Sequence, residues 1–331
     1  MSGMRLIAGS GRSGTTWVQD ALATANDLRP VFEPLHPAVS NIGARYAYRA
    51  LAADEDHPEL ERFLLEACAG RRHAMWTRFR GRPDLMLPPL AQLTTVDAVK
   101  QLHYLWRKFF REMPELAIVG WRSTPLLKCI RVNLMLAWMS RRFLCKTVLI
   151  VRHPGAVVES QSRLGAIWDP EPVLQRYRVD SRLHELTRHR YRALLERRLS
   201  RVEALTANWI IENQWAIEQA AVNGVTVVFY ERLKASPACE WKRVARALEL
   251  PSVPDAAVLE RPSQQSSGNP PPGVERPSDE PRWLRSLSPE QVAQIQGVLD
   301  EAHFDLYTMT DTEPHDAIES ADCGQTMASA K

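Results

Sequence analysis

The sequence lacks a long hydrophobic segment and has few cysteines. None of its apolar runs approaches the roughly 20 residues that an α-helix needs to cross a bilayer, so we expect no membrane span. No basic and then apolar segment opens the chain, which predicts that it carries no secretory signal. The 5 cysteines are scattered and form no C-x-x-C pair, which favours a reducing compartment and argues against a structural zinc site. These observations predict a cytoplasmic protein.

The sequence also has little net charge and no internal repeat. A formal charge of +3 over 331 residues argues against a protein that binds nucleic acid through a strongly basic surface. The arginine-rich stretch 172–222 is interpreted as solvated helix faces, with a nucleic-acid surface as the alternative. A composition of 45% hydrophobic and 24% charged residues is ordinary for a globular chain of one large or two modest domains.

Short apolar runs, each followed by a turn and a helix-like stretch, set the expected fold class. Such runs occur at 5–9, 117–121, 146–152 and 225–230, and the helical patterns that follow three of them cover 15–25, 154–164 and 233–250. This alternation predicts an α/β fold with a P-loop-like parallel sheet flanked by helices.

The rest of the sequence divides into helical insertions, one long loop and a tail. The stretches 50–112 and 172–222 are helical by pattern and would cover a substrate, and a capping pattern starts a last helix at 288–302. The proline-rich segment 261–283 predicts a functional loop. We expect one domain over 1–309 and a disordered tail over 310–331.

The first motif is "GSGRSGTTW", residues 9–17, directly after an apolar run. Its glycine spacing is that of a phosphate-binding loop, but Thr15 replaces the expected lysine and Arg12 is the only cation. A strand, a glycine turn and a helix gather backbone N–H groups at one point, where an anion binds. The alternative is a plain glycine turn between strand and helix.

A second motif follows the third run, in "VRHPGAVVESQSR". Arg152 stands at the expected carboxyl end of a strand, where a nucleoside triphosphate site would need an acid for its metal ion, and Ser160 comes eight residues later. Glu231 is a weak candidate for that acid. The pair of motifs predicts a donor that has anionic groups in two places and needs no metal.

Together the two motifs resemble those of the sulfotransferase family. "GSGRSGTTW" is similar to its 5′-phosphosulfate loop, and "VLIVRHPGAVVESQSR" is similar to its 3′-phosphate motif. Weaker features follow in the family's order at 119–125, 209–220, 227–237 and 281–291, so the resemblance spans about 4–307. It implies 3′-phosphoadenosine 5′-phosphosulfate (PAPS) as co-substrate, without a metal.

The resemblance also implies roles for individual residues. Arg12 would take the place of the loop cation that stabilises charge on the leaving phosphate. The 5′-phosphate would be held by the loop, the 3′-phosphate by the second motif, and the adenine would lie near a tyrosine. These donor residues are Gly11, Arg12, Ser13, Gly14, Thr15, Thr16, Trp17, Arg152, Ser160 and Tyr230.

A general base must take the proton of the acceptor hydroxyl. The segment "VFEPLHP", 31–37, is similar to the one that carries a catalytic glutamate in carbohydrate-type members. We expect Glu33 to be the base, with His36 as second choice and a structural loop acid as the alternative for Glu33. His153 is interpreted as a supporting residue beside Arg152.

Some features depart from the family or leave its acceptor open. The R-K-G motif of small-molecule members is missing, so loop 261–283 would close the donor site through Ser266, Ser267 or Arg276. The motif forms favour a saccharide or glycosylated metabolite as acceptor. Aromatic residues are candidates to line a sugar site or to pack in the core: Tyr46, Tyr48, Trp76 and Trp106.

Two other functions remain open from the sequence alone. A small-molecule kinase with a degenerate loop would use ATP and magnesium. A nucleotide-binding protein that kept the fold and lost catalysis would bind the donor product without transferring sulfate. Neither the acceptor nor the oligomeric state follows from the sequence.

Overall fold

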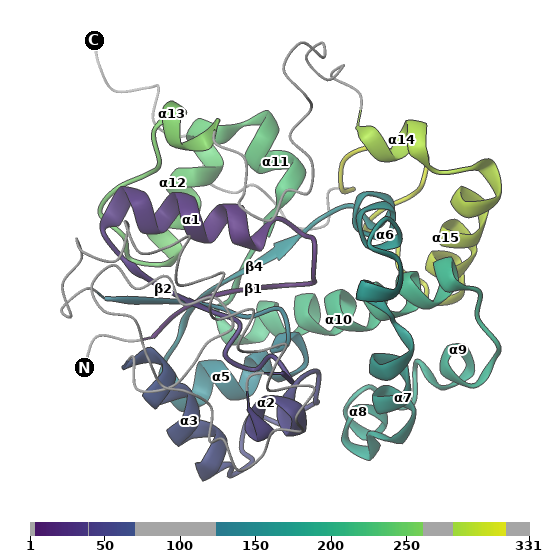
Figure 1. The fold of residues 1–331 in the computed structure, drawn as a ribbon, viewed down its shortest axis with the longest axis horizontal. Coiled ribbons are helices and arrows are strands. Elements are labelled where there is room, and N and C mark those ends of the chain that lie inside the picture. The colour runs from purple at the N-terminus through teal and green to yellow at the C-terminus, as the bar shows by residue number, and fades with distance from the viewer. Residues whose placement is uncertain (1–3, 39, 70–123, 261–280, 316–331) are drawn as a thin grey trace, which may run out of the picture.

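A parallel sheet forms the centre of the molecule. The computed structural model describes residues 4–38, 40–69, 124–260 and 281–315. Within these ranges five parallel strands form one sheet in the order β2-β3-β1-β4-β5 (Figure 1). The strands are β1 (Arg5–Gly9), β2 (Arg29–Phe32), β3 (Pro125–Lys128), β4 (Lys146–Val151) and β5 (Thr226–Phe229). This sheet and its flanking helices confirm the predicted fold class.

Helices cover both faces of the sheet because successive side chains of each buried strand point to opposite faces. Ile7 packs into the core beneath α1 (Thr15–Asn26) and α12 (Pro237–Ala247), while its neighbour Leu6 packs into the larger core on the other face. Figure 1 shows α10 (Arg201–Asn223) and α5 (Leu136–Phe143) on that second side.

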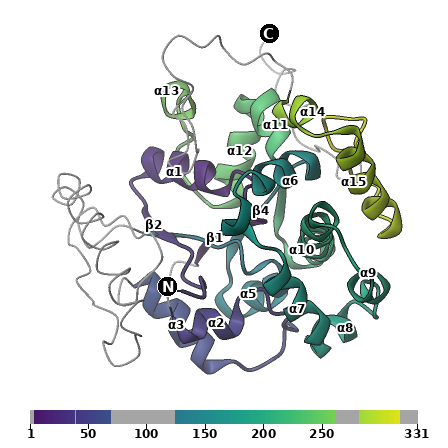
Figure 2. The ribbon, with the colours of Figure 1, turned by 45° about the vertical axis from the view of Figure 1, so that its right-hand side comes forward.

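The remaining helices surround these two layers. Figure 2 shows α7, α8 and α9 grouped beside α10, on the side of the molecule away from α1. The helices not yet given are α2 (Asn41–Tyr46), α3 (Pro58–Cys68), η3 (Asn133–Met135), α6 (Pro154–Ser162), η4 (Gly165–Trp168), α7 (Glu171–Val179), α8 (Ser181–Leu186), α9 (Arg192–Glu196), α11 (Tyr230–Ala235), α13 (Ala256–Leu259), α14 (Arg282–Ser286) and α15 (Pro289–Glu301).

The predicted helices after the first, third and fourth runs are confirmed, as is the last helix. Pro154 occupies the first turn of α6, where its missing N–H costs nothing. Helix α15 begins with a capping box in which Ser288 and Gln291 each bond the other's backbone N–H.

Two strands were not predicted, and proline explains why. Pro30 lies within β2, which tolerates it because β2 is an edge strand of the sheet. Pro125 is the first residue of β3, the other position where a strand accepts proline. The predicted run 117–121 lies outside the described residues, as does most of the predicted helical stretch 50–112.

Other expectations meet the described chain only in part. Residues 310–315 of the predicted tail are described, and the His315 N–H donates to the Leu306 carbonyl at 2.8 Å. No helix in the described ranges is long and apolar enough to cross a bilayer. Cys68, Cys129 and Cys145 are free thiols, but Cys239 is disulfide-bonded.

Candidate functional site

A cavity of about 1000 Å³ lies at the carboxyl ends of the strands, the edge where open α/β sheets bind ligands. Each strand delivers one charged or aromatic residue to its lining. Arg12 follows β1, Glu33 follows β2, Lys128 ends β3, Arg152 follows β4, and Tyr230 follows β5. The sheet therefore brings Arg12, Glu33, Arg152 and Tyr230, each predicted from the sequence, into one cavity.

The glycine loop forms the wall of this cavity beside α1. Gly14 has φ +93°, and a Cβ there would lie 2.5 Å from the Tyr230 ring, so only glycine fits. No side chain caps α1, and its first turn carries no acid. Thr15, Thr16 and Trp17 line the cavity, so the helix start presents uncapped N–H groups and its positive end to a ligand.

Two other loop residues differ in what they face. Gly11 lines the cavity, and its carbonyl accepts a hydrogen bond from Gln161 Nε2 at 2.9 Å. Ser13 is fully buried, and its hydroxyl donates to the Ser10 carbonyl at 2.7 Å. Ser13 thus shapes the turn, while its neighbours form the surface.

Two arginines lie side by side at this end of the cavity. Arg12 Nε donates to Ser160 Oγ at 2.9 Å, and Arg152 Nη1 donates to the Arg12 carbonyl at 3.2 Å. Burial lowers the pKa of Arg12, and the like charges of Arg152 and Arg163 lower it further. Cations held this close together favour an anion between them.

An aromatic ring orients the Arg152 side chain. Its guanidinium carbon lies 4.4 Å from the Tyr230 ring centroid, a cation–π contact. Its Nε is buried and has no hydrogen-bond partner among the described residues. An unmatched buried donor on a cation indicates that a ligand supplies the acceptor. Ser160 lies against Arg12 and is not part of the cavity lining.

Glu33 lies at the other end of the cavity in a buried charge cluster. Glu33 Oε1 accepts from Lys128 Nζ at 2.7 Å and from the Ile130 N–H at 3.0 Å, and its Oε2 accepts from Arg131 Nη1 at 2.6 Å. Burial by itself would raise the pKa of Glu33, but Lys128 and Arg131 outweigh it and hold that pKa below its usual value. Glu33 is therefore ionised, between two cations.

His36 lines the same end of the cavity, but as a neutral ring. Burial, with the charge of Arg131, lowers the pKa of His36 to about 4. Its Nδ1 lies 3.1 Å from the Ala38 N–H and accepts that hydrogen bond. With Nδ1 accepting that bond, the neutral ring carries its proton on Nε2. The role of His36 as second choice for the base stays a prediction.

His153 and Glu231 lie outside the cavity lining and bind each other. The Glu231 carboxylate accepts from the His153 N–H at 2.9 Å and from the Tyr307 hydroxyl at 3.0 Å. The His153 ring stacks on Trp283, with centroids 4.2 Å apart. Both groups are structural, and Glu231 is occupied at each oxygen rather than open as a magnesium ligand. Among the described residues no group of three His, Cys, Asp or Glu could hold a metal.

Several lining residues were missed in the sequence. Lys128 and Arg131 lie at the end of strand β3. Because that strand was not predicted, their position at the sheet edge was not predicted either. Trp168 comes from η4, and a Cβ on Gly11 would lie 2.2 Å from its ring. Asn208 comes from the middle of α10, where an isolated polar residue gives no signal. The predicted closing residues Ser266, Ser267 and Arg276 lie outside the described residues.

The solved structures that match this chain include two sulfotransferase domains, each of them a weak match. No protein-family model and no curated protein matches the chain. The chain is similar to a sulfotransferase domain from the Synechococcus PCC 7002 olefin synthase, at 16% identity and a TM-score of 0.42, over 92% of this chain and 95% of that one. It is also similar to a sulfotransferase domain from the curacin biosynthetic pathway, at 15% identity and a TM-score of 0.39, over 81% of each chain. Identities and TM-scores this low carry no functional argument, so function must be argued from the cavity.

Proposed function

We propose that this chain is a PAPS-dependent sulfotransferase that transfers a sulfuryl group to an acceptor hydroxyl. The observation that carries the proposal is that the two ends of one cavity have different charged groups. Arg12, Arg152 and the start of α1 form an anion-binding end. The ion pair of Glu33 and Lys128 forms the other end, where Glu33 provides a carboxylate. A donor with phosphate groups fits the anion-binding end. An acceptor whose hydroxyl loses a proton fits the end with the Glu33 carboxylate.

The donor end matches the chemistry of PAPS. The unmatched Nε of Arg152 and the uncapped N–H groups of α1 lie near different parts of the glycine loop, so they would hold two anionic groups. Tyr230 and Trp17 pack edge to face with centroids 5.7 Å apart and offer an apolar surface to the adenine. Lys234 lies 4.5 Å from the Trp17 ring centroid and adds a cation.

Transfer would proceed by in-line displacement at sulfur. The acceptor oxygen forms a bond to sulfur while the bond between sulfur and the 5′-phosphate oxygen breaks, and Glu33 takes the proton of the acceptor hydroxyl. Arg12 offsets the charge that develops on the departing 3′-phosphoadenosine 5′-phosphate (PAP). Bound donor anions would offset Lys128 and Arg131, raising the pKa of Glu33 toward the range of a working base.

The acceptor is proposed to be a saccharide or a glycosylated metabolite. The Trp168 ring offers a flat apolar surface of the kind that packs on a sugar ring. The same cavity is lined by hydrogen-bonding side chains suited to hydroxyl groups, namely Tyr48, Asn208 and Asp169. A cavity of about 1000 Å³ holds a donor nucleotide together with a small acceptor.

The test combines ligand binding with transfer of labelled sulfate. PAP should raise the unfolding temperature of the protein more than ATP with magnesium does, and labelled sulfate should pass from PAPS to a saccharide pool. Arg12→Ala should lose most of this turnover with little change in unfolding temperature, whereas the exposed control Arg198→Ala should keep both. Preference for ATP with magnesium would indicate a kinase, and PAP binding without transfer would indicate an inactive nucleotide-binding protein.

A further inference from the structure

Two polar side chains that line the acceptor end of the cavity have no protein partner. Asn208 is 7% exposed, and its buried Oδ1 makes no hydrogen bond among the described residues. The hydroxyl of Tyr48, a half-buried residue, also has no hydrogen-bond partner in the described part of the chain. Buried polar groups are almost always paired, so the unpaired Asn208 Oδ1 indicates a ligand that pairs it, and the Tyr48 hydroxyl lines the same cavity.

Tyr48 is held in a backbone conformation that tyrosine rarely adopts. It has φ +60°, follows Ala47 at φ −54° and ψ 128°, and the Arg49 N–H donates to the Tyr46 carbonyl at 3.2 Å. These values are those of a type II turn, whose third position favours glycine or asparagine. A large aromatic residue at such a position carries strain, and strain of this kind concentrates at functional sites.

The surrounding chain fixes this turn in place. The Tyr48 N–H donates to the Arg131 carbonyl at 3.1 Å. Arg176, from α7, donates to the carbonyl of Ala47 at 2.8 Å. The turn is therefore tied both to the segment that follows β3 and to α7.

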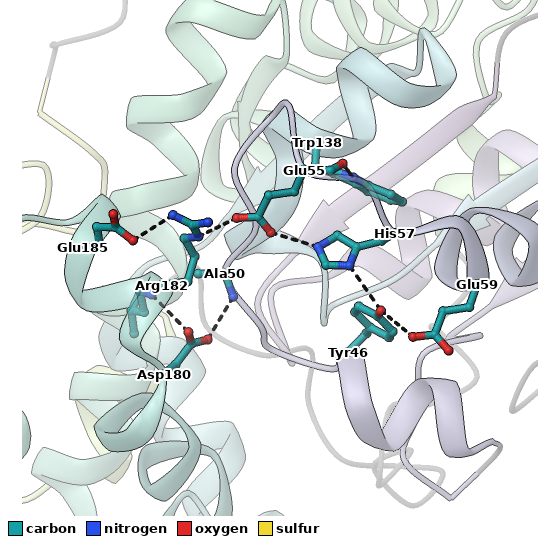
Figure 3. A network of polar contacts seen from close by, with 10 residues as sticks. Tyr46, Ala50, Glu55, His57, Glu59, Trp138, Asp180, Arg182 and Glu185 are labelled. Carbon is teal, nitrogen blue, oxygen red and sulfur yellow. Dashed lines mark hydrogen bonds and ion pairs between the residues drawn. The ribbon is translucent and has the colours of Figure 1, made fainter.

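A polar network anchors the residues on either side of the turn (Figure 3). Before it, the Tyr46 hydroxyl donates to Glu59 Oε1 at 2.7 Å and lies 3.3 Å from His57 Nδ1. After it, the Ala50 N–H donates to Asp180 Oδ2 at 3.2 Å. Because these anchors lie on both sides, the structure can hold Tyr48 in its strained conformation with its side chain at the cavity.

The surroundings of Tyr48 keep its hydroxyl protonated. Burial raises the pKa of the phenol, and the carboxyl groups of Glu212 and Glu33 raise it further, against the opposing charge of Arg131. Arg131 also lies over the Tyr48 ring, 5.4 Å from its centroid. Glu212 lies one helical turn after Asn208 on α10, so both side chains are on one face of that helix. Tyr48 is thus a hydrogen-bond donor above the face of α10 that carries Asn208.

We propose that Tyr48 and Asn208 select acceptors that carry a second hydroxyl beside the reacting one. This inference rests on the proposed sulfotransferase function and assigns the specificity of the same cavity. While Glu33 takes the proton of the reacting hydroxyl, the phenol of Tyr48 donates to the neighbouring oxygen and the amide of Asn208 accepts from it. An acceptor with one hydroxyl would leave the buried Asn208 Oδ1 unpaired and the Tyr48 hydroxyl without its acceptor, which a site of this kind rejects.

The experiment measures labelled sulfate transfer from PAPS to three acceptors. These are methyl α-D-glucopyranoside, trans-cyclohexane-1,2-diol and cyclohexanol. In the wild type, kcat/KM for the two polyhydroxyl acceptors should exceed that for cyclohexanol at least about tenfold, the effect of one hydrogen bond. Tyr48→Phe and Asn208→Leu should each lose most of that preference, and PAP should still stabilise both variants.

Thermal unfolding gives a readout that needs no acceptor. Since neither polar group has a protein partner, Tyr48→Phe and Asn208→Leu should leave the unfolding temperature unchanged or higher. The matched control is Tyr191→Phe, because the Tyr191 hydroxyl donates to Gln214 at 3.0 Å and its loss should lower that temperature. A fall in Tyr48→Phe as large as in the control would assign the phenol a structural role and overturn the inference.

The outcomes separate the inference from the function on which it rests. A chain that PAP does not stabilise and that transfers no sulfate contradicts the proposed function. A chain that PAP stabilises but that transfers no sulfate to any acceptor also contradicts the proposed function. A chain that PAP stabilises and that sulfates the saccharide pool contradicts the inference alone if it sulfates cyclohexanol as well as the diol, sulfates none of the three acceptors, or keeps its preference in both variants.

Discussion

Glu33→Gln tests the buried charge cluster at the acceptor end. The change leaves the side chains of Lys128 and Arg131, which are 4% and 10% exposed, without a carboxylate. Removing one partner of a buried ion pair costs about 3–5 kcal/mol of unfolding free energy. The glutamine carbonyl can still accept the hydrogen bond from the Ile130 N–H, so we expect the lower end, about 3 kcal/mol.

The same cluster predicts how that cost depends on pH. Because the pKa of Glu33 is lower in the folded chain than in the unfolded chain, its stabilisation is complete above about pH 5, beyond the unfolded pKa. It is lost as the pH falls through the folded pKa. The difference in unfolding free energy between wild type and Glu33→Gln should therefore be constant near neutrality and shrink in acid.

Urea unfolding followed by tryptophan fluorescence measures both effects, because the chain has 10 tryptophans. Glu240→Gln is the matched control, since Glu240 is a buried acid that pairs with Arg243, whose side chain is 29% exposed. It should cost about 1 kcal/mol and leave sulfate transfer intact. A cost below about 1 kcal/mol for Glu33→Gln, or a difference that grows in acid, would refute the account of the cluster.

Two further predictions concern the donor loop and α10. Gly14→Ala should weaken PAP binding at least about tenfold in calorimetry, because the new methyl meets the Tyr230 ring at 2.5 Å and φ is +93°; unchanged affinity would exclude that close approach. Burial raises the pKa of Glu212 to about 8, so wild-type stability should fall as the pH rises from about 4 to 8 and then level off. Glu212→Gln should flatten that fall and gain up to about 5 kcal/mol at pH 8, and a wild type without such a slope would contradict the raised pKa.

The sequence predicted most of the sheet and the donor end of the cavity. Strands β1, β4 and β5 are continuous apolar runs, which identify buried parallel strands without further information. Arg12 and Arg152 were placed correctly near strand ends because Arg12 comes three residues after one such run and Arg152 ends another. Their roles toward a donor stay predictions, as does the disordered tail after 310.

The acceptor end was harder to predict because its signals are not local. Strand β3 begins with Pro125 and is short, so Lys128 could not be placed at the sheet edge or paired with Glu33. The strain at Tyr48 depends on a turn that has neither glycine nor asparagine at its third position. The sequence therefore gives no signal for this turn. Asn208 lies among apolar neighbours of a long helix and becomes notable only once its amide is seen without a partner.

The way the strands build the cavity has a consequence for folding. Among the residues that line it, Arg12, Glu33, Lys128, Arg152 and Tyr230 come from five different strand ends, between residue 12 and residue 230 of the chain. No single fragment contains the site, so a ligand can bind only after all five strands have paired. PAP should therefore protect the whole sheet cooperatively against proteolysis, and its binding becomes a measure of whether the domain is completely assembled.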